Sequence, residues 1–406
     1  MAQRGNASTT SLALRNLRGV VIVIVLAFHA MLAYLQWNPA KPAAFDSPPY
    51  AWRAFPIIDS SHFFGFDLFC AWQDVYLMSL MFFLSGLFVW PSLQRKNRWG
   101  FLRDRLLRLG LPYLFGILIL IPIATYPAYA VTGANPSLSA YYDAWRALPF
   151  LPIGPLWFLG QLLIFDVAIT SMHWLAPGAV GTLGRWSAKA EDKFTVYFAV
   201  LLAVSALAYV PLAIAFTPWA WSASGPFAIQ FCRPLLYAVY FLAGVALGAT
   251  DIERGLLRTG GFLARHWARW LAAALASLFL WMGLTDLTIN GYTSIPVQLA
   301  SDLGFVLACA TGCFFVIAAS LRFATRRSRL LDSLSSNAYG LYLVHYDFVV
   351  WLQFALLATA LFAAVKAAIV FALTLLLSWG VVLAAQRIPF GALLIGATSR
   401  RAAPAS

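Results

Sequence analysis

The sequence predicts an all-α, polytopic membrane protein, and three observations support this fold class. The chain is 62% hydrophobic and only 11% charged, whereas a water-soluble domain has roughly 45–50% apolar and about 25% charged residues. Apolar runs long enough to cross a bilayer recur along the chain. Short basic clusters separate these runs on alternate sides. We therefore expect one bundle of about ten transmembrane helices with both termini in the cytoplasm.

The first apolar run is RGVVIVIVLAFHAMLAYL, from Arg18 to Leu35. A cleavable signal has a shorter apolar core, of about 7–15 residues, so this run is interpreted as an uncleaved first helix. Pro, Gly or charged residues bound each later run. The expected helices are 15–36, 74–92, 107–130, 155–175, 195–217, 229–249, 268–288, 297–320, 337–357 and 362–386.

The basic residues fix the expected orientation of these helices. Of the 28 Lys and Arg residues, all but five fall on one side of the expected topology. The five on the other side are Lys41, Arg53, Arg146, Arg233 and Lys366. The positive-inside rule then places the basic side in the cytoplasm. We expect a cytoplasmic tail at 1–14, a membrane domain at 15–386 and a second cytoplasmic tail at 387–406, in a bacterial cytoplasmic (inner) membrane.

The net charge of +13 raises the question of a nucleic-acid partner. The basic residues form short clusters between apolar runs and no extended basic domain, so nucleic acid is not expected and membrane lipid is. No CxxC, Cys/His metal spacing or HExxH motif occurs, and no metal is expected. The expected outer loops, 37–73 and 131–154, are rich in aromatic residues. These could stack on sugars or form an interfacial aromatic belt.

His29 is an ionisable residue in the first expected helix. It lies eleven residues after Arg18, or about 16 Å along a helix axis, which predicts a position near the middle of the roughly 30 Å hydrocarbon core. A functional role is one interpretation, because burying such a group is costly. A neutral histidine bonded to a neighbouring helix is the other. Asp166, deep in the fourth expected helix, is a candidate to fix the tautomer of His29, or else a structural acid.

A second basic cluster lies between the second and third expected helices. Arg105 and Arg108 are three residues apart and should share a helix face, and Arg103 belongs to the same cluster. Arginine forks suit phosphate recognition, so the nucleotide of coenzyme A could dock here while its acyl-carrying arm reaches His29. Ordinary positive-inside charge is the alternative explanation for the cluster.

Several motifs in order along the chain make it resemble the acyltransferase-3 family of membrane acyltransferases. The motifs are Arg18 and His29 with ten residues between them, Phe82-Phe83-Leu84-Ser85-Gly86, Arg105-x-x-Arg108 before Leu111-Pro112-Tyr113, Trp157-Phe158-Leu159, and Tyr342-x-x-His345. Ser85 and Gly86 are expected to serve close helix packing rather than nucleophilic attack. The sequence looks most like the glucan- and polysaccharide-modifying branch of the family.

The resemblance implies an O-acyltransferase that moves an acetyl or succinyl group from cytoplasmic acyl-CoA to a hydroxyl of an extracytoplasmic envelope glycan. It implies that His29 is catalytic, either as the base for direct transfer or as the carrier in an acyl-histidine relay, and that Arg18, Arg105 and Arg108 bind the donor. Arg15 stands where the family often has Asp, and it is expected to be a further arginine near the nucleotide, with Arg103.

Three further residues are expected to contact the acceptor: His345, Tyr342 and Trp157. For His345 a hydrogen bond between helices is an equal alternative. A transporter or exporter of an envelope component, without covalent chemistry, is the competing function class. The absence of paired, broken helices in two similar halves favours the enzyme.

Overall fold

The computed structural model describes residues 9–222 and 229–396. Within these ranges the chain is helical and contains no β-strand, only an isolated bridge between Trp221 and Gln230. The helices are α1 (Thr9–Met31), α2 (Phe64–Gly86), α3 (Val89–Arg95), α4 (Arg98–Arg105), α5 (Leu111–Phe115), α6 (Ile121–Ala130), α7 (Leu138–Arg146), α8 (Trp157–Leu175), α9 (Ala179–Ser187), α10 (Phe194–Phe216), α11 (Pro234–Gly248), α12 (Phe262–Arg265), α13 (Trp267–Ile289), α14 (Ile295–Phe323), α15 (Arg329–Leu356), α16 (Ala363–Ala385) and α17 (Pro389–Leu394).

The all-α, polytopic class is confirmed. Among the described residues, eight continuous helical stretches are long and apolar enough to cross a membrane. They begin at residues 9, 64, 98, 154, 194, 267, 295 and 363. The remaining two expected spans are also helical: α11 is apolar but has 15 residues, and α15 has 28 residues with several polar side chains. The chain is an integral membrane protein.

Helix α2 begins at Phe64, ten residues before the expected start at 74. The polar side chains in this stretch had suggested a loop, but each has a partner. Asp67 accepts hydrogen bonds from the backbone N–H groups of Gln36 and Trp37 at 2.9 and 3.0 Å. Asp74 pairs with Arg233, which is buried at the start of α11. Because these carboxylates are satisfied, they do not end the helix.

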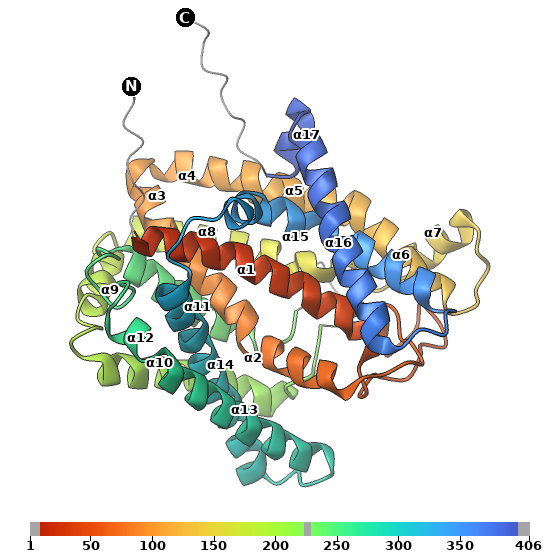
Figure 1. Cartoon of the computed structure of the whole chain (residues 1–406), viewed down its shortest axis with the longest axis horizontal. Helices are drawn as coiled ribbons and strands as arrows, with labels where there is room; N and C mark the ends of the chain where they lie inside the picture. The colour runs from red at the N-terminus through yellow and green to blue at the C-terminus, as the bar shows by residue number, and fades with distance from the viewer. Residues whose placement is uncertain (1–8, 223–228, 397–406) are drawn as a thin grey trace, which may run out of the picture.

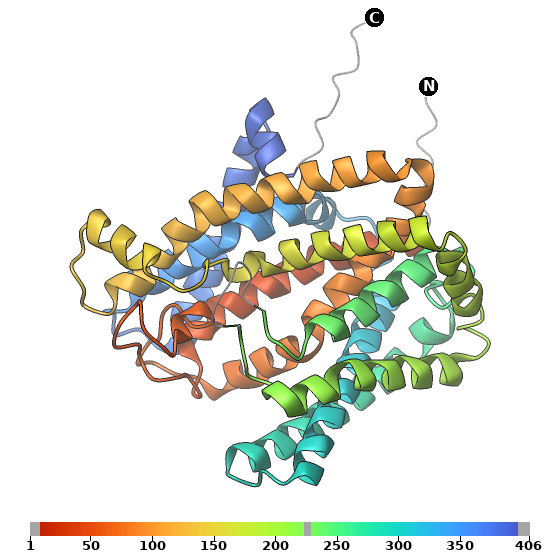
Figure 2. The same cartoon turned by 180° about the vertical axis from the view of Figure 1, so that it is seen from behind.

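The long helices pack side by side, and the contacts between them bring together motifs that are far apart in the sequence. Helix α15 packs between α1 and α16, and α2 packs on α11 (Figure 1). Viewed from behind, α8 runs alongside the long helix that comprises α4, α5 and α6 (Figure 2). Residues far apart in the sequence, on α1, α8 and α15, therefore meet inside one bundle.

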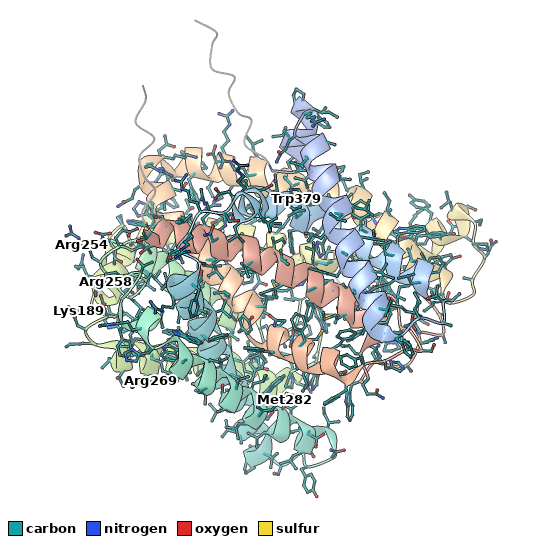
Figure 3. All side chains as sticks on the ribbon, in the orientation of Figure 1. Lys189, Arg254, Arg258, Arg269, Met282 and Trp379 are labelled. Atoms are coloured by element: carbon teal, nitrogen blue, oxygen red, sulfur yellow. The ribbon has the colours of Figure 1, made fainter. Side chains whose placement is uncertain are left out.

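The bundle has two chemically different ends. At the basic end, around α9 and α12, lie Lys189, Arg254, Arg258 and Arg269 (Figure 3). At the opposite end, which we term the aromatic end, lie the segments 37–63 and 131–153, including α7 (Figure 1). Helix α1 runs from one end to the other. The expected tails 1–14 and 387–406 lie partly outside the described residues; α1 begins within the first of these tails and α17 within the second.

Two π-helical turns, Leu106–Gly110 and Gly116–Leu120, interrupt the helix that runs from α4 to α6. Pro112 and Pro122 follow these turns. A proline has no N–H to donate and its ring crowds the carbonyl four residues earlier, so a wider turn relieves the clash and keeps the helix continuous. The first π turn falls on the Arg105-x-x-Arg108 motif.

Glycine allows α2 and α11 to approach closely. A Cβ atom on Gly86 would lie 2.2 Å from the carbonyl oxygen of Phe241, and one on Gly244 would lie 2.1 Å from that of Phe83. Ser85 donates to the carbonyl of Met81 on its own helix. The expected packing role of Gly86 is confirmed, because any larger residue than glycine would push the two backbones apart, and that of Ser85 stays a prediction.

The aromatic end has its own small core. Phe45, Tyr50, Trp52, Tyr141 and Phe150 are buried together there. Arg53 lies over the ring of Phe150 and donates to the carbonyl of Ser222 at 2.6 Å. These five aromatic residues therefore hold the loops to each other, while Trp37, Phe63 and Tyr142 in the same loops are exposed.

A buried ion pair joins this end to the last long helix. Lys366 of α16 donates to Asp59 at 2.8 Å, with side-chain exposures of 1% and 0%. Asp59 also accepts from the N–H of Ser61, and its own N–H donates to Ala33 at the end of the first helical stretch. The segment after α1 is thus fixed from two sides.

Candidate functional site

Two histidines from helices distant in the sequence meet near the end of α1. Nε2 of His345, on α15, lies 3.3 Å from Nδ1 of His29, and the two ring centroids are 5.0 Å apart. Nδ1 of His29 also lies 2.9 Å from the carbonyl oxygen of Val25, and Nδ1 of His345 lies 2.6 Å from that of Tyr342. His345 is fully buried, whereas His29 is only partly buried.

Neighbouring residues hold the turn of α1 that carries His29. Gln353, two turns beyond His345 on α15, donates to the carbonyl oxygens of His29 and Ala30 at 2.9 and 3.3 Å. These carbonyls lie at the helix end, where intrahelical donors run out. The ring of Tyr346 meets that of His29 edge-on at 5.7 Å between centroids. Gln353 was not predicted from the sequence. Its position, eight residues after His345 in an apolar helix, places both polar side chains on one face of that helix.

His29 lies nearer the aromatic end of its helical stretch than expected. The stretch runs from Thr9 to Tyr34, so it begins earlier than the expected residue 15, and its centre falls between Arg18 and His29. The axial separation of these two residues is unchanged at about 16 Å. His29 therefore lies closer to the aromatic loops than to the basic end.

Arg18 and Arg105 form the inner part of the arginine cluster. Arg18 is exposed on α1 and lies over the ring of Phe88, 5.7 Å from its centroid. The charge of Arg105, at the end of α4, acts electrostatically on Arg18. Two cations that act on each other repel unless an anion lies between them.

Asp166 is the partner of Arg105 and not of His29. Nε of Arg105 lies 3.2 Å from the carboxylate of Asp166, which is fully buried on α8, while the arginine side chain is 22% exposed. The structure therefore corrects the expected pairing of Asp166 with His29, because the contact to His29 comes from His345. A buried carboxylate is held by the nearest cation, and the sequence could not show which helix supplied that cation.

The other arginines have different surroundings. Arg103 and Arg108 are exposed, whereas Arg105 is partly buried. Arg105 and Arg108 were expected to share a helix face, but the π turn between them widens the angle between their side chains. Arg15 pairs with Asp332 in the first turn of α15. Its guanidinium is thus engaged by protein, unlike those of Arg103 and Arg108.

Comparison with known protein families shows which family this chain is similar to. The family model for the acyltransferase domain of acyltransferase-3 proteins matches residues 11–383. The chain belongs to the acyltransferase-3 family. No curated protein and no solved structure matches it significantly. The chain is therefore an acyltransferase, and His29 and the arginines lie within the matched domain.

In this acyltransferase two of the three expected acceptor residues, Tyr342 and His345, are close to each other, whereas Trp157 packs on a different group of rings. Tyr342 donates its hydroxyl to the carbonyl of Pro155, just before α8, and its ring lies 5.7 Å from that of His345. Trp157, at the start of α8, stacks on Tyr237. Gly154 has φ +46°, and a Cβ there would lie 3.2 Å from the ring of Tyr346. The backbone at the start of α8 therefore comes close to the histidine pair.

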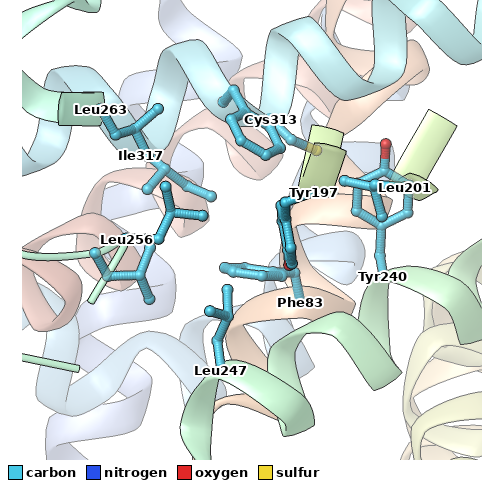
Figure 4. A pocket seen from close by; sticks show the side chains of 11 residues that line it. Phe83, Tyr197, Leu201, Tyr240, Leu247, Leu256, Leu263, Cys313 and Ile317 are labelled. Carbon is cyan, nitrogen blue, oxygen red and sulfur yellow. The ribbon is translucent and has the colours of Figure 1, made fainter. Parts of the chain in front are cut away.

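The cavity drawn in Figure 4 is separate from this acyltransferase site. It lies between α2, α10, α11 and α14 and is lined by apolar and tyrosine side chains such as Phe83, Tyr197, Leu247 and Ile317. None of the site residues expected from the sequence lines it. It offers no charged group to a polar substrate.

Proposed function

We propose that this acyltransferase takes an acetyl or succinyl group from acyl-CoA at its basic end and transfers it to a hydroxyl of an envelope glycan at its aromatic end. One observation carries the proposal. A single helix, α1, presents an exposed Arg18 towards the basic end and a partly buried His29 near the aromatic end. The enzyme would lie in a bacterial cytoplasmic membrane, with the basic end in the cytoplasm.

The arginines supply the donor site in this proposal. Arg18 and Arg105 would hold the phosphates of coenzyme A, with Arg103 and Arg108 exposed at the rim. Bidentate arginine contacts favour phosphate over other anions. The separation of about 16 Å between Arg18 and His29 along α1 suits a ligand whose anionic head and reactive end are joined by an extended arm.

His29 supplies the base. A glycan hydroxyl is a weak nucleophile unless a base removes its proton during attack. The hydroxyl oxygen attacks the thioester carbonyl, the C–O ester bond forms and the C–S bond breaks. His29 takes the hydroxyl proton and returns it to the departing sulfur, so that free coenzyme A leaves as a thiol. Tyr342, whose ring lies 5.7 Å from that of His345, would shape the acceptor side.

The test is mass spectrometry of ester-linked acyl groups on the envelope glycans of the native host. The compared strains are the wild type, a deletion, and the deletion complemented with the wild-type gene, His29→Ala or His173→Ala at matched protein level. His173 packs on Trp90, away from the histidine pair, and serves as the control. We expect one acyl mass to vanish on deletion and to return with the wild type and His173→Ala only.

The acyl mass that returns identifies the transferred group as acetyl or succinyl. Full restoration by His29→Ala would show that this histidine is not the base. If no acyl mass on any glycan depends on the gene, the proposed function is wrong.

A further inference from the structure

The contacts of the two histidines assign their protons. A carbonyl oxygen only accepts, so Nδ1 of His345 must carry the hydrogen that points at the carbonyl of Tyr342, 2.6 Å away. The same argument puts a hydrogen on Nδ1 of His29, which faces the carbonyl of Val25 at 2.9 Å. Among the described residues no carboxylate pairs with either ring, so each ring is written in its neutral form.

With these protons, the two neutral rings can form a hydrogen bond to each other in only one direction. Nε2 of His345 carries a lone pair and accepts a second, shared hydrogen bond from Nδ1–H of His29 at 3.3 Å. Nε2 of His29 then carries a lone pair, and it accepts no hydrogen bond from the described chain. Because His29 is partly exposed while His345 is fully buried, only the lone pair of His29 is open to a substrate.

Building on the proposed function, we infer that Nε2 of His29 is the reactive nitrogen and that His345 is its positioning residue. His345 orients the ring of His29 through Nδ1–H. When Nε2 takes the hydroxyl proton, the lone pair of His345 faces the positive charge that develops on His29 and stabilises it. A neutral imidazole here occupies the place that a carboxylate fills in many catalytic pairs.

The arrangement also retains the proton at the site. His345 has its only other ring hydrogen directed at the carbonyl of Tyr342, which accepts a hydrogen bond but does not take up a proton. The chain of hydrogen-bond donors therefore ends at His345, the second ring. A proton collected by Nε2 of His29 has no route into the protein, and it stays available for the sulfur of coenzyme A.

The test combines spectroscopy with kinetics on the full-length protein in lipid nanodiscs. The five histidines would be labelled with ¹⁵N and ¹³C, and single substitutions would assign His29 and His345 by solid-state NMR. We expect both rings to be neutral with hydrogen on Nδ1, and we expect the Nδ1 proton of His29 to change its shift in His345→Leu. This arm needs no substrate, so it decides the inference even if the acyl-transfer function fails.

The kinetic arm compares His345→Leu, His345→Gln and the control His173→Leu, with acetyl-CoA or succinyl-CoA as donor and the envelope glycan fraction as acceptor. Leu cannot accept from His29, whereas the amide oxygen of Gln reaches the position of Nε2. We expect kcat to fall about tenfold to a hundredfold in His345→Leu with KM for the donor nearly unchanged, to recover largely in His345→Gln, and to stay at the wild-type value in His173→Leu.

Two results would overturn the inference. One is a wild-type spectrum with the hydrogen of His29 on Nε2. The other is a folded His345→Leu protein with unchanged kcat and an unchanged His29 resonance. If the Leu variant does not fold, the wild-type spectrum and the His345→Gln protein decide between the alternatives.

Discussion

At the scale of single residues, the ion pairs divide the basic side chains near α1 into two groups. Asp332 engages Arg15, and the carboxylate of Asp166 lies 3.2 Å from Nε of Arg105. Asp166 is fully buried while the Arg105 side chain is 22% exposed, so the pair fixes the direction of Arg105 and leaves its guanidinium partly accessible to an anion. The two ion pairs lead to different kinetic predictions.

Replacing Asp166 should affect donor binding rather than the chemical step. In Asp166→Leu, Arg105 loses its buried counter-ion and is no longer held in one direction, so we expect KM for acyl-CoA to rise about tenfold. Asp166→Asn should recover little of the affinity, because an amide carries no charge and the Asp166 carboxylate accepts no hydrogen bond from the described chain. Steady-state kinetics check this. A loss confined to kcat would instead connect Asp166 to His29.

Arg15 should contribute little to donor binding, although it stands in the first arginine motif. Its guanidinium is paired with Asp332, and both side chains are more than a third exposed, so the pair is worth about 0–1 kcal/mol. We expect KM for acyl-CoA to change less than about twofold in Arg15→Gln and to fall in Asp332→Asn, which releases a cation near the phosphates. The comparison is Arg18→Gln, where a clear rise in KM is expected. A comparable rise in Arg15→Gln would show that Arg15 binds the donor directly.

At the scale of helices, the contact between α2 and α11 depends on backbone proximity. Gly244→Ala would place a methyl group 2.1 Å from the carbonyl oxygen of Phe83, and this overlap should cost on the order of 3 kcal/mol. Gly283→Ala on α13 is the matched control, because nothing lies within 4 Å of its Cβ position. We expect a lower thermal midpoint in detergent for the first variant only. Equal midpoints would mean that the two helices can separate without loss of stability.

Helices were the level at which the sequence was most informative. Hydropathy and basic clusters located all ten long helices, because burial in lipid constrains composition strongly. Their ends were less certain, as the start of α2 shows, where Asp67 and Asp74 have partners that only the folded chain supplies. The π turn after Arg105 could not be foreseen either, since the i, i+3 rule assumes a regular α-helix.

The candidate site could be predicted only in part from the sequence. Spacing along α1 identified Arg18 and His29, which are local to one helix. The partner of His29 depends on how α1 packs against α15, and the partner of Arg105 depends on α4 against α8. Pairings between helices distant in the sequence require the tertiary arrangement. For His345 the expected alternative of a hydrogen bond between helices is found, while Asp166 pairs with Arg105 and is not the partner of His29.

At the scale of the whole molecule, the two ends of the bundle should lie on opposite sides of the membrane. All four native cysteines are buried and free, so a single introduced cysteine reports its own position. We expect Ala134→Cys at the aromatic end to react with a membrane-impermeant maleimide in spheroplasts, and Arg254→Cys at the basic end to react only after permeabilisation. The reverse pattern would invert the proposed direction of transfer.

The pairing of Asp59 with Lys366 has a consequence for how the protein is made. The two residues are 307 positions apart, so the ribosome delivers the acid long before the base. A nascent chain that lacks α16 therefore carries Asp59 without its cationic partner. Burying a carboxylate without a partner is strongly destabilising, so we expect the segment after α1 to reach its final packing only once the last long helix has been inserted.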